Sequence, residues 1–218
     1  MSDDYTGDVQ RGGAPAVRDL GDGLTLTKVS VGPMDNNAYL LRAGSEQLLI
    51  DAANDAATLL ELIGPAGLRT VVTTHRHQDH WIALEEVVRT TGAQSLAHTD
   101  DAPAIPVVTG TLHDGDIVEV GGHALEVIHV VGHTPGSVVL AYRRPGGRVH
   151  LFTGDSLFPG GVGNTRGDKK NFTSLINDVE RKLFDRFGDD TWFYPGHGKD
   201  STLGAERPHV AEWRARGW

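Results

Sequence analysis

Short runs of apolar residues, bounded by glycine, proline and serine, make up most of the first half of the chain from Leu24 onward. Runs of this length between turn residues are typical of β-strands. The pattern predicts strands at residues 24–31, 37–43, 47–51 and 69–73. Between the third and fourth of these strands, residues 56–63 have a helical pattern that Gly64-Pro65 ends.

Beyond residue 80 the chain combines helical patterns with further strands. Trp81, Leu84 and Val88 share one face of a helix that ends near Gly92, and a second amphipathic helix is predicted within residues 172–187. A final short helix is expected from Glu206 onward. A hairpin turned at Gly121-Gly122 and three more strands are predicted at residues 116–130, 137–142, 148–153 and 192–194.

Strands therefore occur in runs, with helices between the runs. Two sheets covered by helices on their outer faces would use these elements well, which indicates an α/β protein. Residues 1–22 are rich in glycine and aspartate, so we expect a flexible N-terminal tail, followed by a single domain over residues 23–218.

The chain has 218 residues, a formal net charge of −9 and no cysteine, which excludes disulfides and thiolate ligands. It lacks the basic footprint of nucleic-acid-binding proteins, and no apolar run approaches the ~18 residues of a membrane span. The N-terminus has no secretory signal pattern. We expect a cytoplasmic protein with a small-molecule substrate, no nucleic-acid partner and no membrane partner; the sequence indicates no oligomeric state.

Three histidines and an aspartate fall close together in the segment THRHQDHW, residues 74–81. His75 and His77 are two apart at the end of a predicted strand, so their side chains point the same way. Asp79 and His80 follow as the chain turns toward the next helix, and they serve a second point in space. Imidazole and carboxylate groups are the ligands expected for zinc, iron or manganese, so the segment predicts metal binding.

Three later segments each end a predicted strand with a further ligand-type residue. GHTPGS contains His133, TGDS contains Asp155, and PGHG contains His197. Glycine flanks each of these residues, as expected where the backbone must approach a site closely. The three residues therefore extend the predicted metal site beyond the first segment.

In order and spacing, the motifs HxHxDH, GHTPGS, GDSLF and PGHG resemble those of the metallo-β-lactamase superfamily, from about residue 24 to 200. The resemblance implies a four-layer αβ/βα sandwich and two divalent metal ions, zinc in the first place, with iron or manganese as alternatives. It also implies a first metal held by His75, His77 and His133, a second held by Asp79, His80 and His197, and Asp155 bridging the two.

Within this superfamily, the GHTPGS and GDSLF segments look most like the glyoxalase II group, the hydroxyacylglutathione hydrolases. About twenty residues follow His197, where the long glyoxalase II enzymes carry a C-terminal helical domain, so a short form is expected. The resemblance implies a thioesterase in which a metal-bridging hydroxide attacks the acyl carbon and the catalytic residue Asp79 orients it. A thiolate leaves without protonation, which favours a thioester over a lactam.

Two other activities on the same fold remain open at this point. A mononuclear iron persulfide dioxygenase would use two histidines and one carboxylate, here His75, His133 and Asp155. A lactonase would share the HxHxDH motif. β-Lactamases that use a cysteine ligand are excluded because the chain has no cysteine.

Several residues around the motifs are candidates for supporting roles. By family position, Asp51 is expected to hold a ligand histidine through a hydrogen bond. Trp81 is a candidate wall of the substrate pocket, and Arg166, Lys169 and Lys170 are candidates for attracting a substrate carboxylate. The remaining histidines match no motif and are expected at the surface or in the core: His98, His113, His123, His129, His150 and His209.

Overall fold

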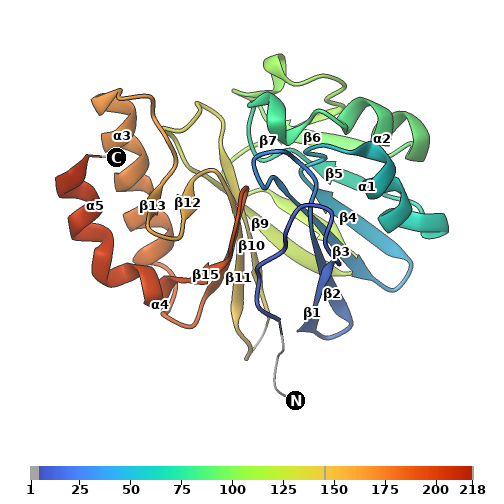
Figure 1. Ribbon diagram of the computed structural model, residues 1–218, viewed down its shortest axis with the longest axis horizontal. Coiled ribbons are helices and arrows are strands. Elements are labelled where there is room, and N and C mark those ends of the chain that lie inside the picture. Colours follow the sequence, from blue (N-terminus) through green and yellow to red (C-terminus); the bar gives the residue numbers. More distant parts are fainter. Residues whose placement is uncertain (1–4, 145, 218) are drawn as a thin grey trace.

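The computed structural model describes residues 5–144 and 146–217 as two β-sheets packed face to face, with helices outside them (Figure 1). The first sheet contains β1 to β7 in chain order. Neighbours from β1 to β4 are antiparallel, and those from β4 to β7 are parallel. The bounds of the seven strands are Ala16–Gly21, Leu24–Ser30, Asn37–Ala43, Glu46–Ile50, Thr70–Val72, Gln94–His98 and Gly110–Leu112.

The second sheet has the strand order β15-β14-β11-β10-β9-β8. Only β11 and β14 are parallel neighbours in it. β12 (Leu157–Phe158) and β13 (Gly161–Val162) form a separate ribbon. In chain order from β8, the strands of the second sheet are Ile117–Val120, His123–His129, Val138–Arg143, Val149–Gly154, Trp192–Pro195 and Ser201–Thr202.

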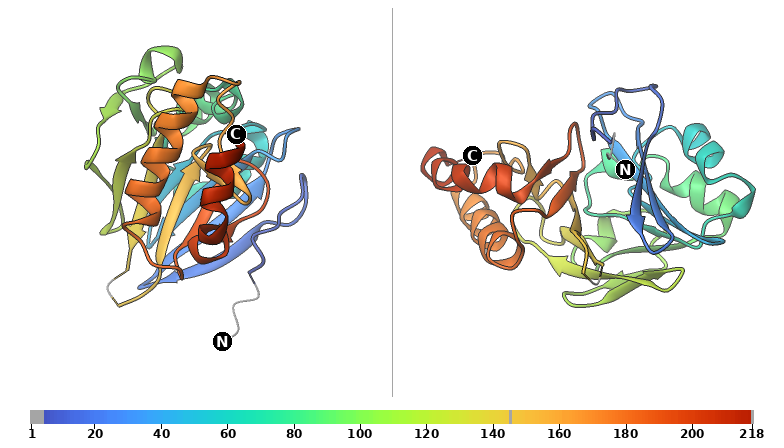
Figure 2. Two further views of the ribbon diagram at one scale, coloured as in Figure 1. Left: turned by 90° about the vertical axis from the view of Figure 1, so that its left-hand side faces the viewer. Right: turned by 90° about the horizontal axis from the view of Figure 1, so that it is seen from below.

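Helices cover the outer face of each sheet. α1 (Ala56–Ile63) and α2 (Leu84–Thr91) pack on the first sheet, and α3 (Lys169–Val179) and α5 (Val210–Arg216) pack on the second. The short helix α4 (Leu203–Glu206) leads into α5. The view from below in Figure 2 shows the succession helix, sheet, sheet, helix. The predicted four-layer αβ/βα sandwich is therefore confirmed.

The central strands bury both faces, and β10 shows how its sequence achieves this. Val138, Leu140 and Tyr142 lie in the apolar cluster between the two sheets. Val139 and Ala141, which alternate with them, lie in the cluster beneath α3 and α5. Because neighbouring side chains of a strand point to opposite faces, an uninterrupted apolar run places one strand in two cores at once.

The expected flexible tail over residues 1–22 is wrong for the described part of that segment. Residues 16–21 form β1, which pairs with β2, and the side chains of Tyr5 and Val9 are buried. Tyr5 packs edge-on against Trp192, with 6.1 Å between the ring centroids. A few long-range apolar contacts thus hold a stretch whose composition is that of a loop, while residues 1–4 lie outside the described residues.

The structure differs from the sequence prediction in two other places. The short parallel strands β6 and β7 were not predicted. The helix expected over residues 172–187 begins at Lys169, and beyond α3 it continues as a π-helical turn over Glu180–Phe184. Asp168 caps α3 by accepting hydrogen bonds from the backbone N–H groups of Lys170 and Asn171. Lys169 and Lys170 therefore belong to the first turn of this helix.

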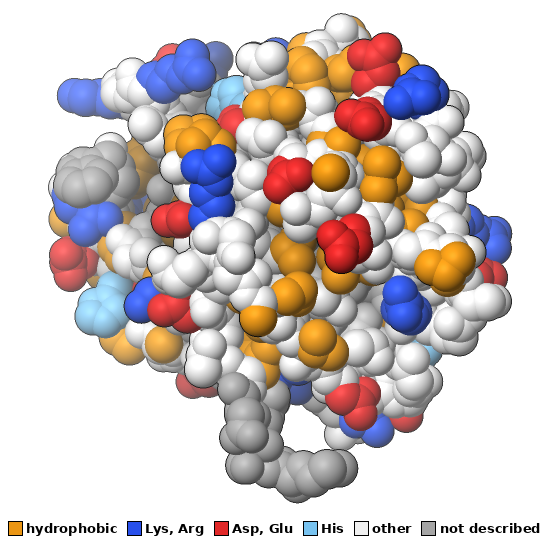
Figure 3. Space-filling model, turned by 45° about the vertical axis from the view of Figure 1, so that its right-hand side comes forward, with side chains coloured by type: hydrophobic (Ala, Val, Ile, Leu, Met, Phe, Trp, Pro, Cys, Tyr) orange, Lys and Arg blue, Asp and Glu red, His pale blue; other side chains and the backbone are white. Residues whose placement is uncertain are grey.

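In the segments that the structure describes, no helix combines the length and the apolar character needed to cross a lipid bilayer. Acidic, basic and apolar side chains are interspersed on the face shown in Figure 3. That face shows no continuous field of basic side chains.

A buried ion pair ties β2 to the segment that follows β14. The Lys28 Nζ atom lies 2.6 Å from Asp200 Oδ1, and both side chains are fully buried. Lys28 also donates to the backbone oxygens of Gly7 and Gly198, and the Tyr5 hydroxyl donates to Asp200. Burial lowers the pKa of Lys28 and raises that of Asp200, so each charge depends on the other and on these hydrogen bonds.

Replacing Lys28 with methionine is expected to lower the free energy of unfolding by about 3–5 kcal/mol, because Asp200 would be left as an unpaired buried charge. Urea denaturation measures this change. The matched control is Arg69→Met, which removes an exposed ion pair with Glu46 and is expected to cost below about 1 kcal/mol. Equal, small losses in the two variants would contradict the structural role given to Lys28.

Candidate metal centre

Seven histidine and aspartate side chains meet where four loops follow strand ends. His75, His77, Asp79 and His80 come from the loop after β5, and His133 comes from the loop after β9. Asp155 directly follows β11, and His197 follows β14. Residues far apart in the sequence are therefore brought together by the pairing and packing of these strands.

The first cluster contains three imidazoles. His75 Nε2 lies 3.1 Å from His77 Nδ1, which lies 2.8 Å from His133 Nε2. His75 is buried and His77 is partly exposed. Three ring nitrogens this close to one another leave room for one shared positive centre between them, so the arrangement suits a metal ion.

The second cluster contains two imidazoles and a carboxylate. His80 Nε2 lies 3.2 Å from His197 Nε2, which in turn lies 3.3 Å from Asp79 Oδ2. The ligand-type atoms of the three residues lie within 4.8 Å of one another. This group offers a second set of metal ligands beside the first.

Asp155 lies between the two clusters. Its Oδ2 atom is 3.4 Å from His133 Nε2 and 3.5 Å from His197 Nε2, and its Oδ1 atom is 3.4 Å from His80 Nε2. Oδ1 is buried and accepts no hydrogen bond from the residues that the structure describes. One carboxylate thus faces both clusters and has an oxygen left for a further positive centre.

The hydrogen bonds behind the imidazoles determine which ring nitrogens face inward. His80 Nδ1 lies 2.8 Å from Asp51 Oδ2, and His133 Nδ1 lies 2.9 Å from the backbone oxygen of Asn164. His197 Nδ1 likewise lies 2.9 Å from the Met34 oxygen. A carboxylate or carbonyl oxygen only accepts, so each Nδ1 carries a proton, and Nε2 is the ring atom that faces the centre. This is the tautomer that binding a metal through Nε2 requires.

Asp51 also supports the first cluster. It accepts hydrogen bonds from the backbone N–H and the hydroxyl of Thr74, and the Thr74 hydroxyl oxygen lies 3.1 Å from His75 Nδ1. Asp51 adopts a left-handed backbone conformation with φ of 60°. Asp51 therefore contacts His80 directly and His75 through Thr74, and so helps to orient both rings.

Charges in the site separate the histidines into two kinds. Burial, together with the neighbouring imidazole of His133, lowers the pKa of His77 to about 4, and burial also lowers the pKa of His75 and His133. Burial opposes protonation of His197 too, but hydrogen bonds to Asp155 and Asp79 raise its pKa to about 10. The imidazoles of the first cluster are thus neutral at neutral pH. In the second cluster the neighbouring carboxylates favour a positive charge on His197.

The carboxylates remain ionised. The hydrogen bond from His197 lowers the pKa of Asp79 to about 2. Burial alone would raise the pKa of Asp155, but the positive charge of His80 and the close approach of the His197 and His80 rings hold it well below the usual range. Anionic oxygens beside imidazole rings form the donor set expected for zinc, iron or manganese.

Glycine at residue 196 permits the close approach of two loops. A Cβ atom at Gly196 would lie 2.3 Å from Asp155 Oδ1 and 2.5 Å from His80 Cε1. A larger residue would displace the ligands, which explains why glycine precedes His197.

Asn36 is a supporting residue that the sequence motifs did not single out. Its amide is fully buried and donates to Asp79, with Asn36 Nδ2 2.9 Å from Asp79 Oδ2 and 3.1 Å from the Asp79 backbone oxygen. The backbone of Asn36 also forms an isolated β-bridge with His197. The signal in the sequence was a pair of asparagines at the start of a strand, but the contacts of Asn36 arise only from the tertiary structure.

A cavity of about 370 Å³ opens over the centre. Besides five of the seven residues, Met34, Gln78, Asn164 and Arg166 line it. Arg166 is thus the one residue of the predicted basic group in the lining, since Lys169 and Lys170 are exposed in the first turn of α3. Trp81 is absent from the lining; its indole N–H donates to the Arg76 oxygen, and its ring packs on the cluster beneath α1 and α2.

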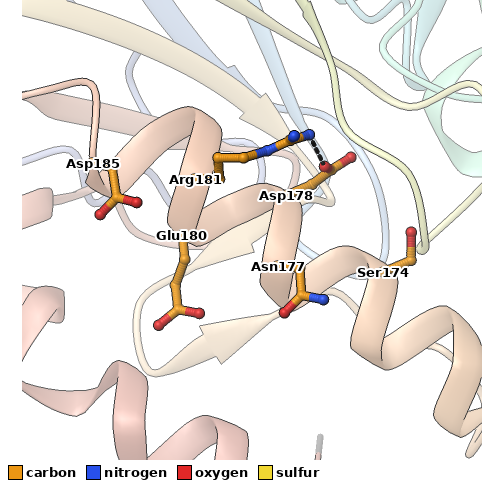
Figure 4. Close-up of a pocket in the computed structure, with 6 residues that line it drawn as sticks. All are labelled: Ser174, Asn177, Asp178, Glu180, Arg181 and Asp185. Atoms are coloured by element: carbon orange, nitrogen blue, oxygen red, sulfur yellow. Dashed lines mark hydrogen bonds and ion pairs between the residues drawn. The ribbon is translucent and has the colours of Figure 1, made fainter.

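A larger cavity of about 700 Å³ lies along α3 and the π-helical turn (Figure 4). It contains none of the seven residues. Its lining is polar, and two of its charged side chains, Arg181 and Asp178, pair with each other at 3.1 Å. This cavity offers no grouping suited to hydrolysis.

A further group of ligand-type residues, apart from the seven, contains His98, Asp100 and His129. The rings of His98 and His129 stack with 3.8 Å between centroids and 23° between planes. Lone pairs of imidazole lie in the ring plane, so two stacked rings do not direct them at one ion. We therefore assign no metal to this group.

The fold and the two clusters define a metallohydrolase-like protein of the αβ/βα type. A family model of the metallo-beta-lactamase superfamily matches residues 31–204, so the chain belongs to this superfamily, as the motifs predicted. An uncharacterized protein of Mycobacterium tuberculosis is 29% identical over 214 residues, which cover 84% of this chain and 95% of that protein.

Two further relatives bear on the function. A hydroxyacylglutathione hydrolase of Anaeromyxobacter dehalogenans is 40% identical over 133 residues, which cover 61% of this chain and 50% of that protein. The solved structure of TTHA1623 in a di-iron-bound form matches with a TM-score of 0.67 and 28% identity, covering 83% of this chain and 96% of that one. The similarity to hydroxyacylglutathione hydrolases is thus moderate and extends over part of the chain.

Proposed function

We propose that the protein is a dinuclear metal-dependent hydrolase that cleaves small acyl-thioesters. The observation that carries this proposal is the arrangement of four imidazole rings around the carboxylate of Asp155. The Nδ1 atom of each ring is hydrogen-bonded to an oxygen outside the centre, and its Nε2 atom faces inward; the four residues are His75, His80, His133 and His197. Such a set fits two metal ions better than it fits a solvated polar loop.

In this proposal the ligands divide as the two clusters do. The first metal is held by His75, His77 and His133, and the second by Asp79, His80 and His197, with Asp155 shared. When bound, such ions lower the pKa of a coordinated water to about 7 and so supply hydroxide at neutral pH. Asp79, kept ionised and held by Asn36, orients the nucleophile toward the acyl carbon.

The leaving group is proposed from what the cavity provides. Apart from the ligand residues, the described side chains that line it are Met34, Gln78, Asn164 and Arg166. None of them is a general acid that titrates near neutral pH. A thiol has a pKa of about 8.5 and leaves as the thiolate without such an acid, whereas an amine does not. The similarity to a hydroxyacylglutathione hydrolase supports the same choice.

The rim of the cavity supports a substrate with an apolar part and an anionic part. Met34 is 57% exposed at the rim. Arg166 also lines the cavity, and its positive charge adds to burial and His133 in lowering the pKa of His77. We propose that Arg166 attracts a carboxylate on the thiol or the acyl group. Zinc is the proposed metal, and the di-iron relative supports iron as the alternative.

A substrate panel tests the proposed function. Metal-stripped protein reloaded with zinc, and separately with iron, is assayed on acyl-thioesters of glutathione and of smaller thiols, on lactones and on a chromogenic lactam. We expect kcat/KM to be highest for a thioester. Hydrolysis of the lactone alone would contradict the thioester proposal, and oxygen uptake on a persulfide with one iron per chain would identify a dioxygenase instead.

A further inference from the structure

Asp101 is a fully buried carboxylate outside the seven ligand positions. It lies at the N-terminus of the short 3₁₀ turn Ala102–Ala104, after β6. An aspartate at such a position ordinarily accepts hydrogen bonds from the first N–H groups of its own turn. The side chain of Asp101 makes no bond of that kind and instead reaches two other loops.

The two loops are those that carry the ligands of the first cluster. Asp101 Oδ2 lies 3.0 Å from the backbone nitrogen of Arg76, the residue between His75 and His77. The same oxygen lies 2.5 Å from the hydroxyl of Thr134, the residue after His133. Asp101 Oδ1 accepts a third hydrogen bond, at 3.0 Å, from the backbone nitrogen of Gly136.

These contacts are specific to a carboxylate at this position. The guanidinium of Arg76 is 3.9 Å from Asp101 Oδ1, so three donors at hydrogen-bond distance provide most of the stabilisation of a fully buried anion. A Cβ atom at Gly136 would lie 2.8 Å from Asp101 Cγ, so glycine is needed for this approach. One side chain thereby fixes the distance between the HxH loop and the His133 loop.

The second cluster has its own buried polar support. Asn36 donates to the side chain and the backbone of Asp79, and among the described residues its amide makes no hydrogen bond to Asp101 or to the loop that carries His133. Asn36 is as deeply buried as Asp101. Asp51 contacts both clusters, whereas Asp101 bonds to the segments that carry His75, His77 and His133, and Asn36 bonds among the ligand residues to Asp79 alone.

We propose that Asp101 is a positioning residue for the first metal: it holds His75, His77 and His133 at the separation that one ion requires, and it acts on the second metal only weakly. This inference rests on the dinuclear centre proposed above. Its consequence is that the affinities of the two metals can be changed separately through residues that touch neither ion.

Zinc titration of metal-stripped protein tests the inference. For Asp101→Asn we expect one of the two zinc ions to bind about 10- to 100-fold more weakly, the range for loss of an outer-shell partner, and the other to bind within about threefold of the wild-type affinity. Anomalous scattering from crystals of the zinc-loaded variant identifies the weakened site, which should be that of His75, His77 and His133. Asn36→Ala is the matched control and should weaken the other site.

Three outcomes would overturn the inference. Unchanged affinity for both ions in Asp101→Asn would contradict it, and so would equal weakening of both sites, which indicates a general structural defect. If the wild-type protein binds two ions, neither of these two results contradicts the proposed function. A wild-type protein that binds fewer than two ions would overturn the inference and the proposed function together.

Two substitutions of Thr134 that change the side-chain volume little test the inference without depending on the folding of the Asp101 variant. Thr134→Val removes one donor to Asp101 with little change in volume, and Thr134→Ser retains the hydroxyl. We expect Val to weaken the first site and Ser to preserve its affinity. With cobalt as the probe, the visible absorption of the ion at the first site should shift in the Val variant and match the wild type in the Ser variant. The same spectrum in both variants would contradict a positioning role.

Discussion

Replacing Asp155 with alanine is expected to abolish hydrolysis and to leave neither metal tightly bound. Its two oxygens lie 3.4 Å from His133 and from His80, one in each cluster, so a single substitution removes an anionic ligand from both sites. Losing a partner that only supports a ligand costs about 10- to 100-fold in metal affinity, and losing the shared ligand itself should cost more than that for each ion.

Zinc affinity and thioester hydrolysis of Asp155→Ala measure this effect. Asp155→Asn is the second variant, because it keeps the shape and one oxygen while removing the charge. Asp189→Ala removes a carboxylate from an exposed ion pair with Arg207 and controls for the change in net charge. An Asp155→Ala protein that folds, binds both ions and hydrolyses thioesters would contradict the bridging position.

Replacing Asp79 with asparagine is expected to lower kcat by about 10²- to 10⁴-fold, the size of effect that a positioned side chain acting on the reacting group contributes. The hydrogen bond from His197 holds the pKa of Asp79 at about 2, so the native side chain is an anion at neutral pH, whereas the amide is neutral and cannot accept at both atoms. Because Asp79 acts on the nucleophile, KM should change much less than kcat.

Steady-state kinetics on zinc-loaded Asp79→Asn separates the two constants. Gln78→Ala, which alters a neighbouring residue in the cavity lining, is the control and should affect KM more than kcat. A fall in kcat/KM that comes entirely from KM would contradict the role given to Asp79 and would place it in substrate binding.

The candidate ligands were predictable because local sequence carries their signal. His75 and His77 are two apart at a strand end, and His133, Asp155 and His197 each lie beside glycine after a strand, so pattern alone singled them out. The family resemblance then divided them into the two sets that the structure brings together. The distances between these residues could not be predicted from any single segment, because the centre is formed by four loops from two sheets.

The supporting residues were not predictable in the same way. Asn36 contacts Asp79, 43 positions away, and Asp101 contacts Thr134, 33 positions away. Short polar side chains near turns look alike in sequence whether they face water or a buried loop. Tyr5 shows the same limit in the fold, because its burial against Trp192 follows from long-range packing and not from its glycine- and aspartate-rich surroundings.

The stoichiometry of metal binding tests the dinuclear centre most directly. Metal-stripped wild-type protein is titrated with zinc in competition with a chromophoric chelator, and the ions bound per chain are counted. The proposed centre predicts two tight equivalents. One tight equivalent, or none, would contradict it.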